Sequence, residues 1–234
     1  MNVKITCFLP CRKGSQRIAN KNIRPFSNYQ YGLLEIKLNQ LAKVQEIDEI
    51  ILSTNDEEII NYASTLDISN LIVDVRDDRL CSNQTSTDEL IEYAGKIVQE
   101  GHILWTHVTS PFITEEVYTK AIAEYAAGLK AHYDSLMTVS TINGFIWNEG
   151  GPVNYDYTNE KWPRTQTISP LYEINSGIFL ASTNVYHERK DRIGDRPLFY
   201  ETSTIESLDI DWEEDWKIAE AIMNQVYNEE LKIR

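Results

Sequence analysis

The chain has 234 residues, and its 22 Lys and Arg against 36 Asp and Glu give a formal net charge of −14 at pH 7. This acidity argues against nucleic acid as a partner, because binding a phosphate backbone requires a broad basic face. No apolar stretch approaches the roughly 18 residues of a membrane-spanning helix, and the N-terminus lacks the features of a signal peptide. Three cysteines without CxxC spacing favour reduced thiols over disulfides or a zinc site. We therefore expect a cytoplasmic protein that contacts neither nucleic acid nor membranes.

Strands and helices are predicted to alternate along the first 141 residues. Apolar runs indicate buried strands at 3–10, 49–54, 70–75, 102–108 and 134–141, and helical spacing indicates helices at 32–44, 56–66, 86–99 and 114–128. The third helix opens on a capping-box pattern from Ser86 to Glu89. The fourth has Thr114 as its N-cap and Gly128 just past its end. This alternation predicts an α/β fold with a mainly parallel sheet and helices on both faces.

The alternation breaks between 143 and 172, a stretch that is rich in Gly, Pro, Asn and aromatic residues and lacks helical periodicity. We interpret it as an excursion from a single domain that spans 1–234. It is either a long surface loop or a functional element, namely a lid or a dimerisation arm, because structureless inserts of this length are usually functional. Strands at 174–182 and 197–203 and a helix at 211–229 complete the predicted elements.

A strongly basic loop follows the first predicted strand. The stretch LPCRKGSQRIANKNIRPF (9–26) contains five cations and lies in an acid-free segment from Thr6 to Leu34; the cations are Arg12, Lys13, Arg17, Lys21 and Arg24. In open α/β sheets, ligands bind beyond the carboxyl ends of the strands, where this loop begins. The pattern is neither GxxxxGK[ST] nor GxGxxG, so it indicates neither a Walker NTPase nor a dinucleotide-binding protein.

The chemistry of this loop suits a small polyanion. Gly14 permits a backbone conformation in which main-chain N–H groups face an anion. Arg12 and Lys21 can hold phosphate oxygens from two sides. We interpret the loop as a triphosphate-binding site; the alternative is a solvated cationic loop.

Two aspartates near the C-terminal end form a second motif. Asp209 and Asp211 follow an extended segment, in which alternate residues point the same way. They can therefore share a hard cation such as Mg²⁺ or Mn²⁺, with nucleotide phosphates and water completing its coordination. The alternative is that Asp211 is the N-cap of the last helix.

With these residues in view, the loop LPCRKGSQRIANKNIRPF resembles the N-terminal signature of the CMP-sugar synthetases, the acylneuraminate cytidylyltransferase family. Further segments match in order: ILSTNDEEI (51–59), LCSNQTST (80–87), VTSPF (108–112), PRTQ (163–166), INSGIFL (174–180) and SLDIDWEEDWKIAE (207–220). The resemblance implies a Rossmann-like nucleotidyltransferase fold, CTP and an acidic sugar as substrates, and a bound metal. It also implies a homodimer in which the 143–172 arm reaches the partner.

The resemblance also implies roles for particular residues. On the nucleotide side these are Arg12, Gly14, Ser15, Asn22, Arg76 and Ser82. On the sugar side they are His107, Thr109, Ser110, Arg164, Gln166 and Asn175. Arg12, Lys21 and Asp211 are the implied catalytic residues, and Asp209 and Asp211 the metal ligands. From the sequence alone, CSNQTST is only a polar loop before a helix, and a lone histidine such as His107 is more often structural.

The sequence departs from the family pattern on the sugar side. Ile113 and Glu173 stand where the family typically has arginines, and Gln16 replaces a common lysine beside Arg17. We therefore predict weak activity with N-acetylneuraminic acid and better activity with another acidic sugar.

The predicted reaction is attack of an acceptor hydroxyl on the α-phosphorus of CTP, with release of pyrophosphate, driven by positioning and charge neutralisation. Three alternatives remain at this point: CMP transfer to a phosphonate or polyol, a GT-A-like glycosyltransferase with an Asp-x-Asp metal site, and a non-catalytic nucleotide-binding module.

Cys7 and Cys11 are expected to be a buried thiol and a rim residue, and not nucleophiles. Trp212 and Trp216 are expected to pack in the core or the arm.

Overall fold

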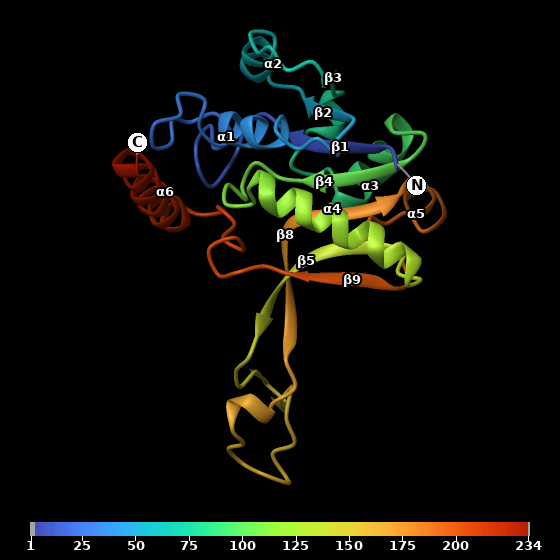
Figure 1. Ribbon diagram of the computed structural model, residues 1–234, viewed down its shortest axis with the longest axis vertical. Coiled ribbons are helices and arrows are strands. Elements are labelled where there is room, and N and C mark those ends of the chain that lie inside the picture. The colour runs from blue at the N-terminus through green and yellow to red at the C-terminus, as the bar shows by residue number, and fades with distance from the viewer. Residues whose placement is uncertain (1–2, 234) are drawn as a thin grey trace.

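The computed structural model describes residues 3–233. Seven strands form one sheet in the order β3-β2-β1-β4-β8-β5-β9 (Figure 1). The strands are β1 (Ile5–Cys11), β2 (Glu49–Thr54), β3 (Leu71–Val75), β4 (His102–Thr106), β5 (Ser135–Ile142), β8 (Leu171–Ser182) and β9 (Pro197–Glu201). β8 runs antiparallel to β4 and β5, and the other pairs are parallel. The prediction of a mainly parallel sheet is confirmed.

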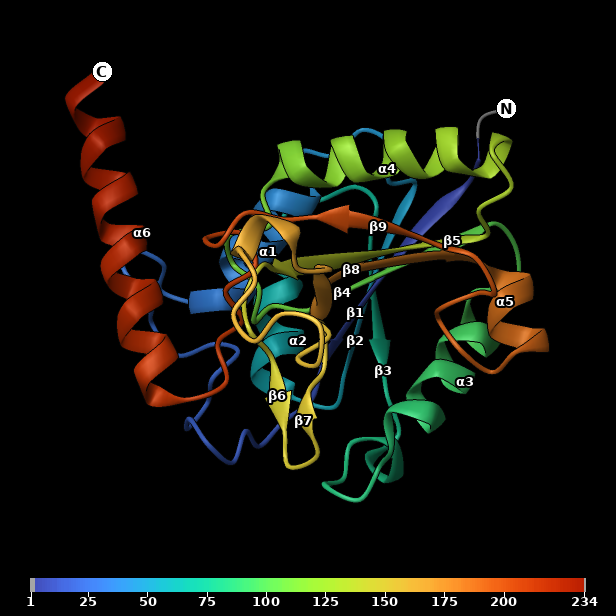
Figure 2. The same ribbon diagram turned by 90° about the horizontal axis from the view of Figure 1, so that it is seen from below.

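Helices cover both faces of this sheet, as predicted. They are α1 (Gly32–Leu41), α2 (Glu57–Ala63), α3 (Thr87–Ile97), α4 (Glu115–Lys130), α5 (Thr183–Glu188) and α6 (Glu213–Ile233). Figure 2 shows α4 on one side of the sheet and α3 and α5 on the other. The short α5 is absent from the sequence prediction, because six residues are too few to show a helical period. Among residues 3–233, no helix combines the length and the apolarity needed to cross a bilayer.

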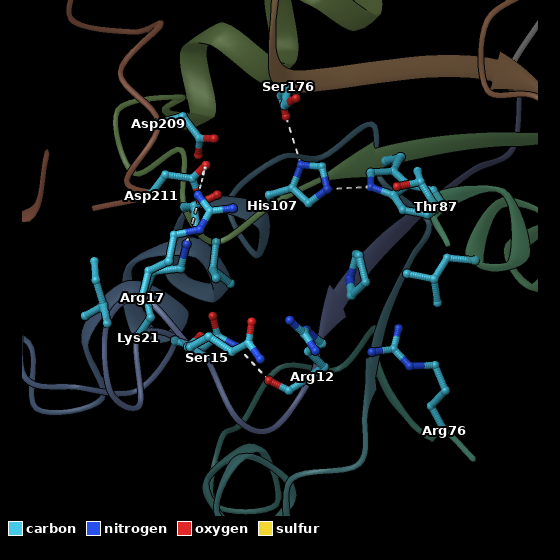
Figure 3. Close-up of a pocket in the computed structure, with 18 of the residues that line it drawn as sticks. Arg12, Ser15, Arg17, Lys21, Arg76, Thr87, His107, Ser176, Asp209 and Asp211 are labelled. Atoms are coloured by element: carbon cyan, nitrogen blue, oxygen red, sulfur yellow. Dashed lines mark hydrogen bonds and ion pairs between the residues drawn. The ribbon is translucent and has the colours of Figure 1, made fainter. Parts of the chain in front are cut away.

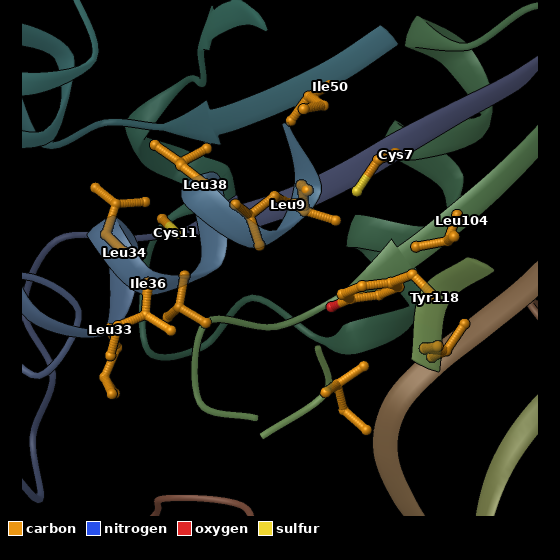
Figure 4. Packing of buried hydrophobic residues seen from close by; sticks show 14 of the residues in the cluster. Cys7, Leu9, Cys11, Leu33, Leu34, Ile36, Leu38, Ile50, Leu104 and Tyr118 are labelled. Atoms are coloured by element: carbon orange, nitrogen blue, oxygen red, sulfur yellow. The ribbon is translucent and has the colours of Figure 1, made fainter. Parts of the chain in front are cut away.

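Two apolar cores result from the alternation of side chains along the strands. Cys7 and Leu9 of β1 face the core that includes α1 and α4, together with Tyr118 (Figure 4). Phe8 faces the opposite core, which includes α3 and α5 and contains Trp105. The burial of these side chains on both faces removes apolar surface from water and holds the strand ends in fixed positions.

The boundaries of two helices differ in how well the sequence predicts them. The capping box of α3 is confirmed, with the Glu89 N–H 3.1 Å from Ser86 Oγ and the Ser86 N–H 2.8 Å from Glu89 Oε2. Gly128 does not follow α4 but lies within it, so that prediction is wrong. A Cβ at Gly128 would lie 3.1 Å from Leu198 Cδ2. The glycine therefore permits close packing of α4 against β9 and does not end the helix.

The excursion leaves the sheet between β5 and β8 and protrudes from the domain (Figure 1). It contains the small hairpin of β6 (Trp147–Asn148) and β7 (Gly151–Pro152) and a 3₁₀ turn at Thr165–Thr167. The ring of Phe145 packs edge-on against Tyr155 and Trp162, with centroids 5.3 Å away in each case. The side chain of buried Asn154 bonds the backbone of residues 144, 146 and 169. The excursion, called the arm below, is thus an ordered unit with its own small core.

Two expectations about burial are wrong. Cys11 is not a rim residue, because its side chain is only 1% exposed and belongs to the core. Trp216 is buried as expected, but Trp212 is 60% exposed and packs in neither the core nor the arm. The three cysteines are free and buried, and burial raises the pKa of the Cys11 thiol to about 12. Burial raises the pKa of the Cys7 thiol as well, so Cys7 and Cys11 are protonated and shielded, as expected for cysteines that are not nucleophiles.

Candidate active site

A pocket of about 520 Å³ lies at the carboxyl ends of β1 and β4 (Figure 3). The chain leaves β1 toward β2 on one side, while β4 pairs with β1 on the other. This reversal of strand order opens a crevice between the loops, which is where open α/β sheets bind ligands. The basic loop, the segment after β4, the start of α3 and the 209–211 segment surround it.

Many of the predicted site residues meet in this pocket. It is lined by Arg12, Ser15, Lys21, Asn22, Arg76, His107, Thr109, Asp209 and Asp211. The other predicted residues are not part of its lining: Gly14, Ser82, Ser110, Arg164, Gln166 and Asn175. The pocket also contains residues that the sequence did not indicate, among them Thr87, Leu90, Trp105, Ser176 and Arg192.

Some of the predicted residues outside the lining have structural contacts of their own, whereas Ser110 Oγ is buried without a hydrogen-bond partner in the described chain. Ser82 Oγ accepts the backbone N–H groups of Gln84 and Thr85 before α3, at 3.2 and 3.1 Å. Asn175 donates to Ser140 Oγ and Thr202 Oγ1 at 3.1 and 2.6 Å. Ser110 is buried and follows β4. Arg164 and Gln166 lie in the arm, and Gly14, with φ of +80°, precedes the lining residue Ser15.

The two residues that depart from the family pattern also lie outside the lining. Ile113 is fully buried, and Glu173 is exposed on β8, paired with Ser140 of β5. Neither side chain therefore faces a ligand in the pocket of this chain.

Hydrogen bonds across the sheet hold the basic loop in shape. Asn22 Nδ2 donates to the carbonyl of Arg12 at 3.2 Å, and the N–H of Lys13 donates to Asn55 Oδ1 at 2.9 Å. The Arg12 guanidinium donates to Asn83 Oδ1. Arg12 forms none of the ion pairs that the structure describes, so its charge is available to a ligand anion.

The packing of α6 brings the two aspartates to this loop. Trp216 of α6 meets Phe26 edge-on with ring centroids 4.9 Å apart. Ile210 is fully buried, and its N–H donates to the carbonyl of Thr109 at 2.9 Å. Because alternate residues of an extended segment point in the same direction, Asp209 and Asp211 both face the pocket.

Asp211 lies between two cations of the basic loop. Its Oδ2 is 2.7 Å from Arg17 Nη1, and its Oδ1 is 3.1 Å from Lys21 Nζ, which also donates to the carbonyl of Ile210 at 2.7 Å. Burial raises the pKa of Asp211, but the hydrogen bonds from Arg17 and Lys21 outweigh burial and hold that pKa below its usual value. Asp211 is therefore ionised, and it shares its charge between the two cations.

The alternative role of Asp211 as an N-cap is wrong. Its carboxylate accepts no backbone N–H of α6 among the described hydrogen bonds. Instead, Asp215 Oδ2 accepts the N–H groups of Asp211 at 3.0 Å and Trp212 at 2.7 Å. The beginning of α6 is thus stabilised by Asp215, which leaves the side chain of Asp211 free to face the pocket.

Asp209 differs from Asp211 in that one of its carboxylate oxygens has no partner. Oδ1 is buried and accepts no hydrogen bond within the described chain. Burial raises the pKa of Asp209, while a hydrogen bond with the Thr109 side chain opposes this rise. An unpartnered buried carboxylate oxygen beside a second carboxylate fits a hard cation. Among the side chains that the structure describes, no three His, Cys, Asp or Glu gather around a possible metal position, so phosphate and water would have to complete the coordination.

His107 is held as a neutral ring by two hydrogen bonds. The indole N–H of Trp105 donates to Nε2 at 2.9 Å, and Nδ1 lies 3.0 Å from the carbonyl of Ser176. Since a carbonyl can only accept, the proton is on Nδ1. Burial lowers the pKa of His107 to about 4. His107 therefore has no free nitrogen to act as a general base, and it fixes the positions of Trp105 and Ser176.

A buried lysine that does not line the pocket supports its β4 side. Lys37 of α1 is fully buried, and its Nζ donates to the carbonyls of Ser110 at 2.8 Å and Ile113 at 3.2 Å and to Tyr118 Oη at 2.9 Å. These bonds fix the turn that follows Thr109. Nothing in the sequence indicates this role, because Lys37 looks like an ordinary polar residue of a helix.

The sheet topology and the cation-rich pocket at its switch point define a nucleotide-binding α/β protein of the nucleotidyltransferase type. A sequence model of the family described as Cytidylyltransferase matches residues 6–233. The chain therefore belongs to the cytidylyltransferase family and is a CTP-dependent nucleotidyltransferase, as the resemblance predicted.

Individual relatives agree with this assignment. Pseudaminic acid cytidylyltransferase of Campylobacter jejuni is 31% identical over 195 residues, which cover 80% of this chain and 82% of that protein. CMP-N,N'-diacetyllegionaminic acid synthase of Legionella pneumophila is 26% identical over 243 residues, covering 94% and 97%. The structure of CMP:2-keto-3-deoxy-manno-octonic acid synthetase complexed with CTP has a TM-score of 0.66 at 13% identity, covering 95% of this chain and 99% of that chain. The structural likeness confirms the predicted fold.

Proposed function

We propose that this cytidylyltransferase transfers CMP from CTP to the hydroxyl of an acidic sugar and releases pyrophosphate. The observation that carries the proposal is one pocket in which an unpaired cation, Arg12, faces a carboxylate pair, Asp209 and Asp211. The names of the relatives in Campylobacter and Legionella, both of which refer to acidic nonulosonate sugars, support the choice of acceptor.

The loop residues have the chemistry to hold the triphosphate of CTP. Arg12 is free to bind phosphate oxygens, and Arg17 and Lys21 can exchange the Asp211 carboxylate for phosphate with little loss, because both are already charged donors. Arg76 is 2% exposed, and its buried Nη1 has no partner in the described chain. That guanidinium suits an oxygen of the nucleotide, as the resemblance implies.

Asp209 and Asp211 are the residues that would hold a divalent cation such as Mg²⁺ or Mn²⁺. When bound, such a cation neutralises charge on the transferred phosphate and lowers the pKa of a coordinated hydroxyl. The acceptor oxygen forms the new bond to the α-phosphorus as the bond to pyrophosphate breaks. The protein's contribution is to align the two reactants and to neutralise charge.

A pyrophosphate-release assay tests the acceptor. The panel is pseudaminic acid, N,N'-diacetyllegionaminic acid, N-acetylneuraminic acid and 2-keto-3-deoxy-manno-octonic acid, each with CTP and Mg²⁺. We expect release with at least one acid, and weaker release with N-acetylneuraminic acid than with another member. Release with a phosphonate or polyol but with none of these acids would overturn the proposal in favour of a non-sugar acceptor.

The nucleotide preference can be measured without an acceptor. A ligand that binds only the folded state raises the melting temperature by mass action. We expect CTP with Mg²⁺ to raise it more than ATP, GTP or UTP at the same concentration. Equal shifts with all four nucleotides would contradict a site built for cytidine.

The arm is proposed to mediate a homodimer. Its apolar side chains are left in water in the single chain: Trp147 is 51% exposed, Val153 48% and Trp162 68%. Exposed apolar surface of this kind marks contact sites, and symmetric dimers are the commonest assembly. We expect light scattering at micromolar concentration to give the dimer mass, and Trp162→Ser to shift it toward the monomer. A monomeric mass for the unaltered chain would contradict this.

A further inference from the structure

The pocket contains a second cationic group, on the side formed by β4 and β8. Arg192 lies in the segment between α5 and β9, and its side chain lines the pocket together with Trp105 and His107. Its Cζ lies 3.6 Å from the ring centroid of Phe179 and 5.1 Å from that of Trp105. The guanidinium is therefore placed on an aromatic surface on this side of the pocket.

No carboxylate in the described part of the chain forms an ion pair with this guanidinium, although the charge of the adjacent Asp191 favours its protonated form. Among the ion pairs and hydrogen bonds that the structure describes, none involves the guanidinium of Arg192. The adjacent carboxylate of Asp191 accepts the backbone N–H of Arg192 at 2.6 Å and that of Ile193 at 3.3 Å. By contrast, Arg189 of the same segment pairs with Asp195. A largely desolvated cation without an anion is costly, and burial lowers the pKa of Arg192 from its usual value, although arginine stays charged.

Trp105 and His107, which line this side of the pocket with Arg192, are occupied by hydrogen bonds, whereas the buried hydroxyl of Tyr186 has no partner in the described chain. Trp105 donates to His107, and His107 donates to the carbonyl of Ser176. The N–H groups of Arg192 are thus the unoccupied charged donors on this side of the pocket. A guanidinium that stacks on a ring keeps its N–H edge available, and that edge matches the two oxygens of a carboxylate.

We propose that Arg192 binds the carboxylate of the acceptor and selects acidic acceptors over neutral ones. This inference rests on the proposed transfer of CMP to an acidic sugar. A phosphate oxygen of CTP has similar chemistry, but the phosphate-binding cations lie on the other side of the pocket, on the basic loop with Arg12 and Lys21. The experiment below distinguishes whether Arg192 binds the carboxylate of the acceptor or a phosphate of CTP.

The experiment compares an acid of the panel that the enzyme uses with the same sugar as its neutral C1 carboxamide. Arg192→Met keeps the apolar stem on Phe179 and removes the charge. Arg192→Lys keeps the charge and loses the planar fork. Arg196→Met is the matched control, because Arg196 lies in the same segment and stacks on Tyr133, with Cζ 5.7 Å from the ring centroid, but does not line the pocket.

We expect Arg192→Met to lower kcat/KM for the acid by about 10- to 100-fold, mainly through KM, as for loss of hydrogen bonds to a charged group. The KM for CTP, the melting temperature shift by CTP and the kcat/KM for the carboxamide should stay near those of the unaltered enzyme. Arg192→Lys should recover part of the loss, and Arg196→Met should behave like the unaltered enzyme.

Two results would overturn the inference while the proposed function stands. One is an equal loss for acid and carboxamide, which indicates a packing role. The other is a rise in KM for CTP with no change for the acid, which assigns the guanidinium to the triphosphate. If no acid of the panel is a substrate of the unaltered enzyme, the proposed function itself fails, and this inference fails with it.

Discussion

The two sides of the pocket handle charge differently. On the loop side, formed by the basic loop and the 209–211 segment, Arg17 and Lys21 are paired with the carboxylate of Asp211. The side chains of Arg17 and Asp211 are 47% and 45% exposed. On the strand side, formed by β4, β8 and the segment before β9, the guanidinium of Arg192 lies on aromatic rings without an anion.

The two sides therefore differ in whether their cations can change partners. On the loop side, Arg17 can exchange the carboxylate of Asp211 for a ligand, whereas Arg192 on the strand side is held in place by its packing. The half-exposed pair of Arg17 with Asp211 contributes little to stability, so Arg17 can leave this carboxylate for a triphosphate at small cost, whereas Lys21 is only 14% exposed and also donates to the carbonyl of Ile210. The strand side cannot rearrange in this way, since His107 and Ser176 are bound to each other and the cation is packed on rings. We infer that the loop side adapts to the reacting groups and that the strand side determines which acceptor enters.

The largest effect is expected on the loop side, from Asp211→Asn. The substitution keeps the size of the side chain and removes one of the two charges available to a divalent cation. We expect turnover to fall by about 10²–10³-fold, the loss that follows removal of one electrostatic contact with a transition state. The free energy of unfolding should change by less than about 1 kcal/mol, because the pair with Arg17 is half-exposed and Lys21 keeps its hydrogen bond to the carbonyl of Ile210. Steady-state kinetics and urea unfolding measure the two effects.

Glu213→Gln is the control for this substitution. Glu213 pairs with Arg24 at 2.7 Å near the same helix end, but it does not line the pocket. Its neutralisation should leave turnover near that of the unaltered enzyme. Near-normal CMP transfer by folded Asp211→Asn at saturating Mg²⁺ and CTP would exclude a metal role for Asp211 and would remove the distinction between exchangeable and fixed charge.

The loop side was largely predictable from the sequence, and the strand side was not. The basic loop and the Asp209–Asp211 pair are patterns of neighbouring residues, so their chemistry is visible without the fold. Arg192 reaches the pocket only because β8 inserts antiparallel between β4 and β5 and α5 turns the chain back. Nothing in its local sequence distinguishes it from Arg189 or Arg196. Packing of elements distant along the chain decides which of these arginines faces the ligand.

Helix positions were predicted where local chemistry determines them and missed where packing does. The capping box at Ser86 is a local device, and it formed as expected. Gly128 serves the contact between α4 and β9, which the sequence of the helix does not reveal. Lys37 is another case, because only the fold places carbonyl oxygens around its ammonium group.

Lys37 is a buried basic residue that, like Arg192, forms no described ion pair with a carboxylate, and its effect on stability should depend on pH. Burial lowers the pKa of Lys37 to about 7, below its usual value of 10.5. Between these two values the unfolded chain binds more protons than the folded one, so the free energy of unfolding rises with pH. From pH 7 to 8.5 we expect the unaltered protein to gain about 1 to 2 kcal/mol relative to Lys37→Met. Urea unfolding at several pH values measures this difference.

The unfolding measurements should stay below the pH at which groups near Lys37 begin to titrate, because these groups also make stability depend on pH. Burial raises the pKa of the Cys7 thiol and of the Tyr118 hydroxyl, and both act in the opposite direction at higher pH. Lys43→Met is a suitable control, because Lys43 is an exposed cation paired with Glu115 at 2.8 Å. If the free energy of unfolding changes with pH in the same way for the unaltered protein and Lys37→Met, the buried amine keeps its ordinary pKa, and this prediction is wrong.

The smallest effect is expected for the aromatic contact of the loop side. Arg17 Cζ lies 4.9 Å from the ring centroid of Trp212, which is 60% exposed. Exposed contacts of this type contribute about 0.5 to 1 kcal/mol, so Trp212→Leu should lower the free energy of unfolding by no more than that.

The counterpart on the strand side is Phe179, which is 1% exposed and carries Arg192. Phe179→Leu leaves a cavity in a packed core and should cost more than about 1 kcal/mol. Urea unfolding of the two variants under one set of conditions compares them directly. If Trp212→Leu costs as much as Phe179→Leu, the loop side is as rigid as the strand side, and adaptation of its charges to the triphosphate loses its physical basis.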